Sequence, residues 1–334
     1  MQHFRKAESA MIYGAVTMGQ QAYLAQGAVI RSIGDSIVIG HHSMVLENSV
    51  IIGNPELITR IGEKVVFGHR TLVIGAAIGN LCEIGNACII MPKADIGDWC
   101  ILGEGTLIPE GMKIPAYSVV IGRPGRILRS LSEADQAAIT RLRNGDTTLL
   151  GGVGQPYQNG ILVEEANMGK LYAYKNQFPQ IAKTAFLFDS AEITGDVFIG
   201  DDCIIGAGVK IIGDSHGPVR IGSNVQILEN TVLHLLPDNQ LVIEDGVVIG
   251  PGCMIHGCKI GQHSVIEPGA IVCDYSEIGA NSLVKAGSVV KQRSTFPNNA
   301  VIDGFPAKLM DTLAKPLDFP RWALTLGELR SLLT

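Results

Sequence analysis

Three of the eight histidines, His69, His234 and His256, are the residues whose type and spacing best suit chemistry. Imidazole can bind a divalent metal or transfer a proton near neutral pH. Shifting the chain by 182 residues aligns its two halves, and this shift places each histidine opposite a residue that can do neither. The opposing residues are, in the same order, Pro251, Ile52 and Ile74. At each of these three positions, therefore, only one of the two halves carries histidine: the first half at His69, and the second half at His234 and His256.

The remaining histidines are less suggestive. His41, His42 and His263 coincide with none of these positions, and we expect them at solvated corners of the fold. His216 lies two residues after Asp214 and is a candidate for a proton shuttle or a substrate contact.

The elements that must position these residues follow a period of six. Aliphatic–Gly pairs recur at multiples of six residues, as in Ile78-Gly79, Ile84-Gly85 and Ile96-Gly97, and again in Ile199-Gly200 and Ile205-Gly206. Neither an α-helix nor an alternating strand has this period. It indicates a hexapeptide solenoid, in which three short strands make a triangular coil and the aliphatic residues stack inside. A Gly-rich sandwich does not predict a strict six.

The 182-residue shift also predicts a duplicated domain. It places Ile39-Gly40 on Ile221-Gly222, and the register holds without a gap from about residue 39 to 124. We expect one β-helix domain over residues 10–128 and a second over residues 186–310.

Different material joins and follows these domains. Within the linker, residues 129–185, Ser132 caps a predicted helix over Ala134–Arg143, which Asn144-Gly145 ends. In the C-terminal tail, residues 311–334, the end from Leu317 to Thr334 is expected to form a short helix after Pro320.

Composition and charge exclude several classes of protein. The chain is 46% hydrophobic and 17% charged, with 40 glycines, which disfavours disorder and long helices. A net charge of −6 without a basic tract argues against nucleic acid and anionic membrane as partners. The sequence shows no apolar run long enough for a membrane span and no signal-peptide pattern at residues 1–20.

The seven cysteines lack the spacing of a metal knuckle. Most, such as Cys82, Cys88 and Cys203, lie within apolar repeats, where we expect them to act as small hydrophobic residues. A reducing cytoplasm is the compartment that this cysteine usage favours.

Several phrases resemble the γ-class carbonic anhydrases. They are Asn230-Thr-Val-Leu-His234, Gly68-His69, the run from Ile255 to Gly261, and the closing phrases Val120–Pro124 and Ile302–Lys308. The resemblance covers about 240 residues, counted over both halves. It implies an all-β, left-handed parallel β-helix in two tandem copies, in which three histidines bind a divalent metal at the boundary between neighbouring subunits.

Carried over residue by residue, the resemblance makes His69 the middle ligand, and His234 and His256 the first and third. Together they form one complete set, whereas the reciprocal boundary would offer only Ile52, Ile74 and Pro251. The implied cofactor is Zn²⁺, or another divalent metal such as Fe²⁺ or Co²⁺. Such a metal lowers the pKa of its bound water to about 7.

The family's interface salt bridge is divided in the same way. The family pairs the Arg and Asp of an Arg-Gly-Asp phrase across the boundary. The first half keeps Arg31, followed by Ser32-Ile33, whereas the second half keeps Gly213-Asp214 with Ile212 in the Arg position. We therefore expect Arg31 and Asp214 to form the bridge.

The sequence departs from the family at a polar position near the metal. Where the family has Gln, this chain has Leu46 and Leu228, each followed by Glu. Loss of a positioned polar group typically costs about 100-fold or more in rate. A more apolar site suits an organic substrate better than bicarbonate. Glu229, Asp214 and His216 are the candidates for acid or base.

Three functional hypotheses follow. The first is a metal-dependent lyase or hydrolase that acts on CO₂ or another small carbonyl or acyl substrate. The second is a hexapeptide acyltransferase that uses acyl-CoA, with a histidine as base. The third is a non-catalytic scaffold subunit. We expect a homo-oligomer, whose complete histidine set forms either within one chain or between two chains.

Overall fold

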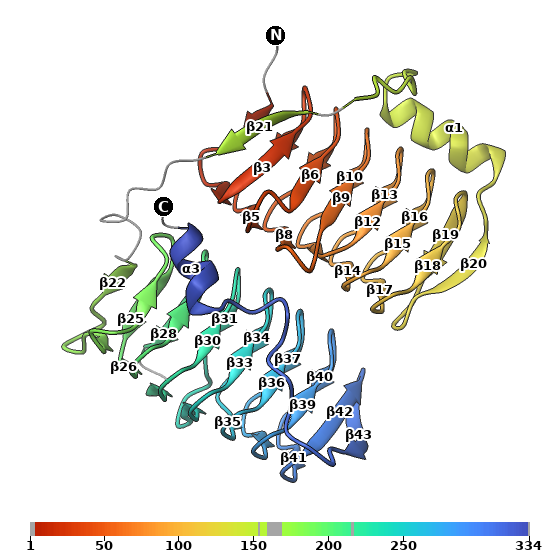
Figure 1. The fold of residues 1–334 in the computed structure, drawn as a ribbon. Coiled ribbons are helices and arrows are strands. Elements are labelled where there is room, and N and C mark those ends of the chain that lie inside the picture. The colour runs from red at the N-terminus through yellow and green to blue at the C-terminus, as the bar shows by residue number, and fades with distance from the viewer. Residues whose placement is uncertain (1–3, 153, 159–168, 215–216, 333–334) are drawn as a thin grey trace. The chain divides into compact units, whose positions relative to one another are not determined.

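The computed structural model describes residues 4–152, 154–158, 169–214 and 217–332. The chain divides into two compact units. Unit 1 comprises Met1–Ile161 and Leu326–Thr334, and unit 2 comprises Leu162–Thr325. Each unit is an all-β solenoid of short parallel strands, so the predicted fold class is confirmed (Figure 1).

Unit 1 contains three sheets, one along each side of its triangular coils. The first sheet comprises β1 (Arg5–Lys6), β4 (Tyr23–Leu24), β7 (Met44–Val45), β10 (Val66–Phe67), β13 (Glu83–Ile84), β16 (Ile101–Leu102), β19 (Ser118–Ile121) and β20 (Arg126–Ser130). The second comprises β2 (Met11–Tyr13), β5 (Val29–Ser32), β8 (Val50–Gly53), β11 (Leu72–Ile74), β14 (Ile89–Ile90) and β17 (Leu107–Ile108). The third comprises β21 (Gln155–Gln158), β3 (Ala15–Met18), β6 (Ile37–Ile39), β9 (Thr59–Ile61), β12 (Ala77–Ile78), β15 (Asp95–Ile96) and β18 (Lys113–Ile114).

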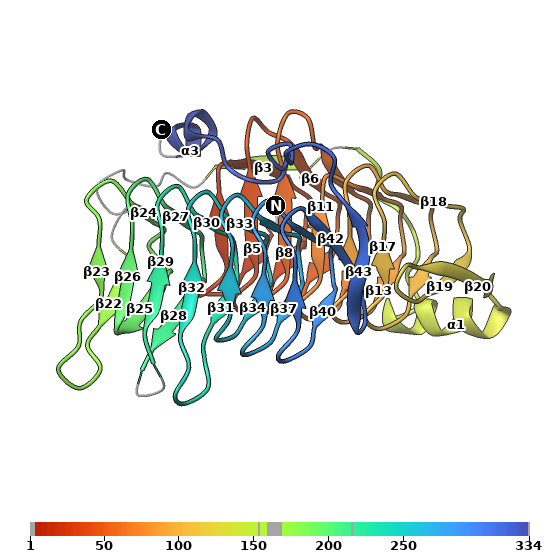
Figure 2. The same cartoon turned by 90° about the horizontal axis from the view of Figure 1, so that it is seen from below.

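Unit 2 repeats this plan, and Figure 2 shows one of its sheets in chain order from β22 to β40. That sheet comprises β22 (Lys170–Tyr172), β25 (Glu192–Gly195), β28 (Lys210–Gly213), β31 (Val232–Leu233), β34 (Met254–Ile255), β37 (Ile271–Val272) and β40 (Val289–Val290). The next comprises β23 (Gln180–Ile181), β26 (Val197–Ile199), β29 (Val219–Ile221), β32 (Leu241–Ile243), β35 (Lys259–Ile260), β38 (Glu277–Ile278) and β41 (Thr295–Phe296). The last comprises β24 (Phe186–Leu187), β27 (Ile204–Ile205), β30 (Gln226–Ile227), β33 (Val248–Ile249), β36 (Val265–Ile266), β39 (Leu283–Val284), β42 (Ala300–Gly304) and β43 (Ala307–Thr312).

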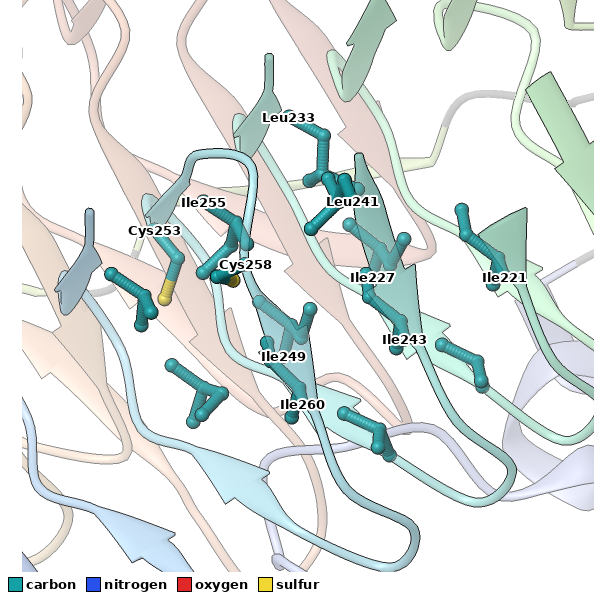
Figure 3. Packing of buried hydrophobic residues seen from close by; sticks show 14 of the residues in the cluster. Ile221, Ile227, Leu233, Leu241, Ile243, Ile249, Cys253, Ile255, Cys258 and Ile260 are labelled. Atoms are coloured by element: carbon teal, nitrogen blue, oxygen red, sulfur yellow. The ribbon is translucent and has the colours of Figure 1, made fainter. Parts of the chain in front are cut away.

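The inward-facing aliphatic residues stack in columns, as the period of six predicts. In unit 2, Ile227 pairs with Ile249, and Leu233 pairs with Ile255, one coil apart (Figure 3). Burying each such side chain contributes about 1.5–3 kcal/mol. Because every coil buries its inner face against the next, the columns hold the whole stack together.

Glycine follows many of these residues because the next coil leaves no room for a side chain. A Cβ on Gly250 would lie 2.7 Å from the backbone nitrogen of Pro268. In the two-residue turns at 47–48 and 229–230, the second residue takes a left-handed conformation, with φ of 58° at Asn48 and 55° at Asn230. These two asparagines are equivalent under the 182-residue shift.

Two described helices lie outside the coils. Helix α1, Glu133–Leu142, begins at the N-cap Ser132, as predicted. Helix α3, Leu326–Leu332, is the short helix expected after Pro320, and it begins six residues beyond that proline. The preceding chain is held outside a helix because Gln226 pairs with both backbone groups of Leu324: its Nε2 donates to the carbonyl at 2.7 Å, and its Oε1 accepts from the N–H at 3.0 Å.

The coils of unit 2 begin before residue 186, since β22 pairs with β25 in the parallel register of the later coils. The domain limits 10–128, 129–185, 186–310 and 311–334 stay a prediction. Neither described helix has the length and hydropathy of a membrane-spanning segment.

The cysteines behave as predicted for Cys82, Cys88 and Cys203, which are all buried. Burial raises the pKa of the Cys88 and Cys203 thiols to about 11, so neither thiol forms a thiolate at neutral pH. These cysteines therefore serve packing rather than chemistry.

Candidate metal centre

His234 and His256 occupy the same register position on successive coils of unit 2. Leu233 pairs with Ile255 at the ends of β31 and β34, and each histidine is the next residue along its strand. Their backbone N–H groups continue the ladder, donating to Ile255 at 3.0 Å and to Val272 at 2.8 Å. The ring centroids lie 6.4 Å apart. The coil repeat therefore brings two imidazoles 22 residues apart in sequence to one surface.

Each of these imidazoles faces a carboxylate. Oδ2 of Asp214, which follows β28, lies 3.7 Å from Nε2 of His234. Oδ2 of Asp274 lies 3.2 Å from Nδ1 of His256. Asp214 was predicted from the sequence, but Asp274 was not. The register of the coils could have indicated Asp274. In that register, Asp274 is opposite Gly257 of the neighbouring coil and therefore diagonal to His256.

A cavity of about 470 Å³ opens beside Asp214 within unit 2. Its walls are the turn Tyr174–Gln177, Asp196, Gly213, Asp214, Gly217 and Pro218. Asp196 forms an ion pair with Arg220 at 2.7 Å. Asp214 lines the cavity and also lies beside His234, so it connects the cavity with the histidine pair. A small molecule in this space can reach Asp214.

In unit 1, His69 follows β10 and is half-exposed. Its Nδ1 lies 2.7 Å from Oε2 of Glu47. Because Val45 pairs with Phe67, residue 47 is opposite residue 69 in the next coil. The predicted acid or base in unit 2 was Glu229, the duplicate of Glu47. Glu229 is opposite Pro251 by the same register and is 1% exposed. Glu47 thus contacts the predicted ligand His69.

The positions of unit 1 that are equivalent to His234 and His256 under the 182-residue shift carry aliphatic residues. Ile52 and Ile74 pair directly across β8 and β11, and both are fully buried. Arg31 pairs with Ile52 on β5 and is fully buried as well. Arg31 belongs to unit 1 and Asp214 to unit 2, so their salt bridge stays a prediction. His216 lies outside the described residues.

One prediction about the histidines is wrong. His41 is buried, and its Nδ1 accepts a hydrogen bond from the backbone N–H of Gln20 at 2.8 Å. It stands where the corner packs against the preceding coil, so its ring satisfies a backbone donor that water would otherwise reach. His42 and His263 are exposed, as predicted.

The donor set suits a divalent ion of the zinc type. Neutral imidazoles are preferred zinc ligands, and in metal sites their second nitrogen usually faces a carboxylate or carbonyl. His256 with Asp274 and His69 with Glu47 have this pairing. Among the described residues, no three His, Cys, Asp or Glu side chains meet as a metal cluster. The predicted set draws its ligands from both units.

Comparison with known proteins identifies the family. A family model described as bacterial transferase hexapeptide (six repeats) matches residues 241–274 and 257–292. A protein named carbonic anhydrase from Geobacillus kaustophilus is 39% identical over 145 residues, which are 43% of this chain and 79% of that protein. The chain belongs to the hexapeptide-repeat family that includes the γ-class carbonic anhydrases.

Other relatives in this hexapeptide-repeat family carry different names. Gamma carbonic anhydrase 2, mitochondrial, from Arabidopsis thaliana is 32% identical and aligns over 51% of this chain and 63% of that protein. Carnitine operon protein CaiE from Escherichia coli K12 is 29% identical, over 41% of this chain and 69% of that protein. The crystal structure of a hexapeptide transferase family protein from Anaplasma phagocytophilum has 28% identity and a TM-score of 0.41, covering 49% of this chain and 90% of that one.

Proposed function

We propose that the chain is a metal-dependent lyase or hydrolase resembling the γ-class carbonic anhydrases, with one divalent cation held by His69, His234 and His256. The observation that carries this proposal is the paired histidines on successive coils of unit 2, with ring centroids 6.4 Å apart. Unit 1 has isoleucine at both equivalent positions and keeps the one histidine that unit 2 lacks. Each unit by itself is therefore an incomplete ligand set.

A bound divalent ion would polarise a substrate carbonyl or lower the pKa of a coordinated water. The residues of the chain would do the rest. Asp214 lies at the wall of a cavity and 3.7 Å from Nε2 of His234, so it can accept a proton from a small molecule there. Glu229, from the sequence prediction, is a second candidate for acid or base. His216 is a third candidate for acid or base, and this proposal rests on the sequence alone.

The surroundings favour a small, weakly polar substrate. Leu46 and Leu228 replace the polar residue of the family, and Leu228 is fully buried. A leucine neither orients a bound water nor accepts its proton. CO₂ is the simplest substrate of this kind, and a small carbonyl or acyl compound is the next.

Metal content tests this proposal. The protein, saturated with Zn²⁺ and desalted, is analysed by mass spectrometry for the wild type and for His69→Ala, His234→Ala and His256→Ala. We expect about one ion per chain in the wild type and loss in every variant, because two imidazoles hold zinc much less tightly than three. His263→Ala is the matched control: this exposed histidine of unit 2 should leave the metal content unchanged.

A full equivalent of metal in His69→Ala would confine the site to unit 2. A wild type that takes up no metal would overturn the proposal. Assays of CO₂ hydration on the same samples then test the substrate: metal-loaded but inactive protein would favour another carbonyl or acyl compound.

The second candidate is a hexapeptide acyltransferase. It is favoured by the family model that matches residues 241–292, whose description is that of a transferase. Release of thiol from acetyl-CoA in metal-free protein would support it, because a histidine base needs no metal.

A further inference from the structure

Asp274 is the most firmly anchored carboxylate near the histidine pair. It follows β37 and is 6% exposed. Its Oδ1 accepts three hydrogen bonds: from the backbone N–H of Leu236 at 3.0 Å, from that of Gly257 at 3.1 Å, and from Nδ2 of Asn239 at 3.2 Å. These donors belong to two different segments of unit 2. Oδ1 is therefore occupied, and the carboxylate cannot rotate without losing three bonds.

The second oxygen of this carboxylate has one partner of interest. Oδ2 lies 3.2 Å from Nδ1 of His256. Nδ1 makes no hydrogen bond in the structure, so this contact acts through charge: an ionised carboxylate at 3.2 Å repels a nitrogen lone pair and favours a hydrogen on Nδ1. A neutral imidazole with its hydrogen on Nδ1 has its lone pair on Nε2.

We propose that Asp274 is the positioning residue that fixes the tautomer of His256 and presents Nε2 to a divalent cation. The role in metal binding rests on the proposed function, whereas the tautomer is a property of the protein alone. The three hydrogen bonds to Oδ1 hold the carboxylate of Asp274 in place, because they determine that Oδ2 is the oxygen that faces the ring of His256. Unit 1 lacks it: the equivalents of Asp274 and His256 are Pro92 and Ile74.

A purely structural role for Asp274 is the competing explanation, since its Oδ1 ties the turn 236–239 to Gly257. The variant Asp274→Asn separates the two. Its amide oxygen can keep the three donors, so the turn should hold. Its amide nitrogen then faces Nδ1 and can only donate, which forces the hydrogen of the ring onto Nε2.

The experiment uses the full chain, free of metal, with ¹⁵N-labelled histidine rings at a pH where the imidazoles are neutral. The signal of His256 is assigned by its absence in His256→Gln. We expect the Nδ1–H form in the wild type and the Nε2–H form in Asp274→Asn. The Nε2–H form in the wild type would overturn the proposal, whether or not the variant folds. The same form in both folded proteins would overturn it as well.

Zn²⁺ affinity provides the second measurement, by competition with a chromophoric chelator. We expect binding about 10–100-fold weaker in Asp274→Asn, with little change in melting temperature. Asp245→Asn is the matched control, because Asp245 also accepts a backbone N–H, from Ser223 at 2.7 Å. That control should bind Zn²⁺ like the wild type. Unchanged affinity in Asp274→Asn would overturn the metal part of the inference, whereas a wild type that binds no zinc would refute the proposed function and leave the tautomer measurement valid.

Discussion

Unit 1 and unit 2 have the same coils but different side chains at equivalent places on their surfaces. Ile52 and Ile74 are fully buried in unit 1, whereas their equivalents His234 and His256 are partly exposed and face carboxylates. His69 is half-exposed beside Glu47, whereas its equivalent Pro251 is buried. The inner columns of aliphatic residues are alike in both.

This difference shows which positions of a solenoid are free to change. The coil is held by its inner column and its backbone ladder. The residues at these positions supply backbone groups to the ladder, but their side chains are not part of the inner column. A duplicated domain can therefore lose a ligand from one copy and keep its fold. The burial of such a position limits which residues it can accept, and this burial differs between the two units.

The largest expected effect comes from exchanging residues at one such position. Ile74→His should lower the free energy of unfolding by about 2–5 kcal/mol, because it places a polar ring in a fully buried aliphatic site. His256→Ile should change it by less than about 1.5 kcal/mol, since 29% of that side chain is exposed. Urea denaturation measures both. Equal losses would mean that the two positions have the same environment after all.

An intermediate effect is expected where unit 2 holds its tail. Gln226 bonds both backbone groups of Leu324, and its equivalent in unit 1 is Met44. Gln226→Met should cost about 1–3 kcal/mol, because it leaves a buried N–H and a buried carbonyl without their partner. Hydrogen exchange at Leu324 should become faster. The reverse change, Met44→Gln, is the control and should leave that exchange rate unaltered.

The smallest effect concerns pH. Burial raises the pKa of Glu267, opposed by Lys285 and by the N–H of Ala286, whereas the equivalent residue in unit 1 is Gly85. Because the folded pKa is raised above the ordinary value of 4.5, the stability that Glu267 contributes is present at lower pH and is lost as pH rises through the folded pKa.

Glu267→Gln keeps an acceptor for Ala286 and removes the buried charge. We expect this variant to be slightly more stable than the wild type at pH 7, with the advantage shrinking as the pH falls toward 4.5. Urea unfolding at several pH values measures this. A wild type that is the more stable at pH 7 would show that attraction to Lys285 outweighs the cost of burial.

The repeating architecture and the divided histidine set could both be predicted from the sequence. A period of six reports directly on coil geometry, because each coil needs the same aliphatic residues at the same places. The shift of 182 residues carries the register from one half to the other, and this is how Pro251, Ile52 and Ile74 are recognised as the counterparts of the three histidines. Helix α1 was predictable because its capping box lies within a few neighbouring residues.

The tertiary structure alone decided the contacts between coils that involve side chains. Glu47 beside His69 and Asp274 beside His256 depend on the diagonal and direct neighbours that stacking creates, and on which way each ring turns. The burial of His41 and the late start of helix α3 have the same origin, because a corner or a tail is fixed by the coil that it packs against. Periodicity in a sequence determines which residues face inward, whereas the partners of the outward-facing residues depend on packing between segments far apart in the chain.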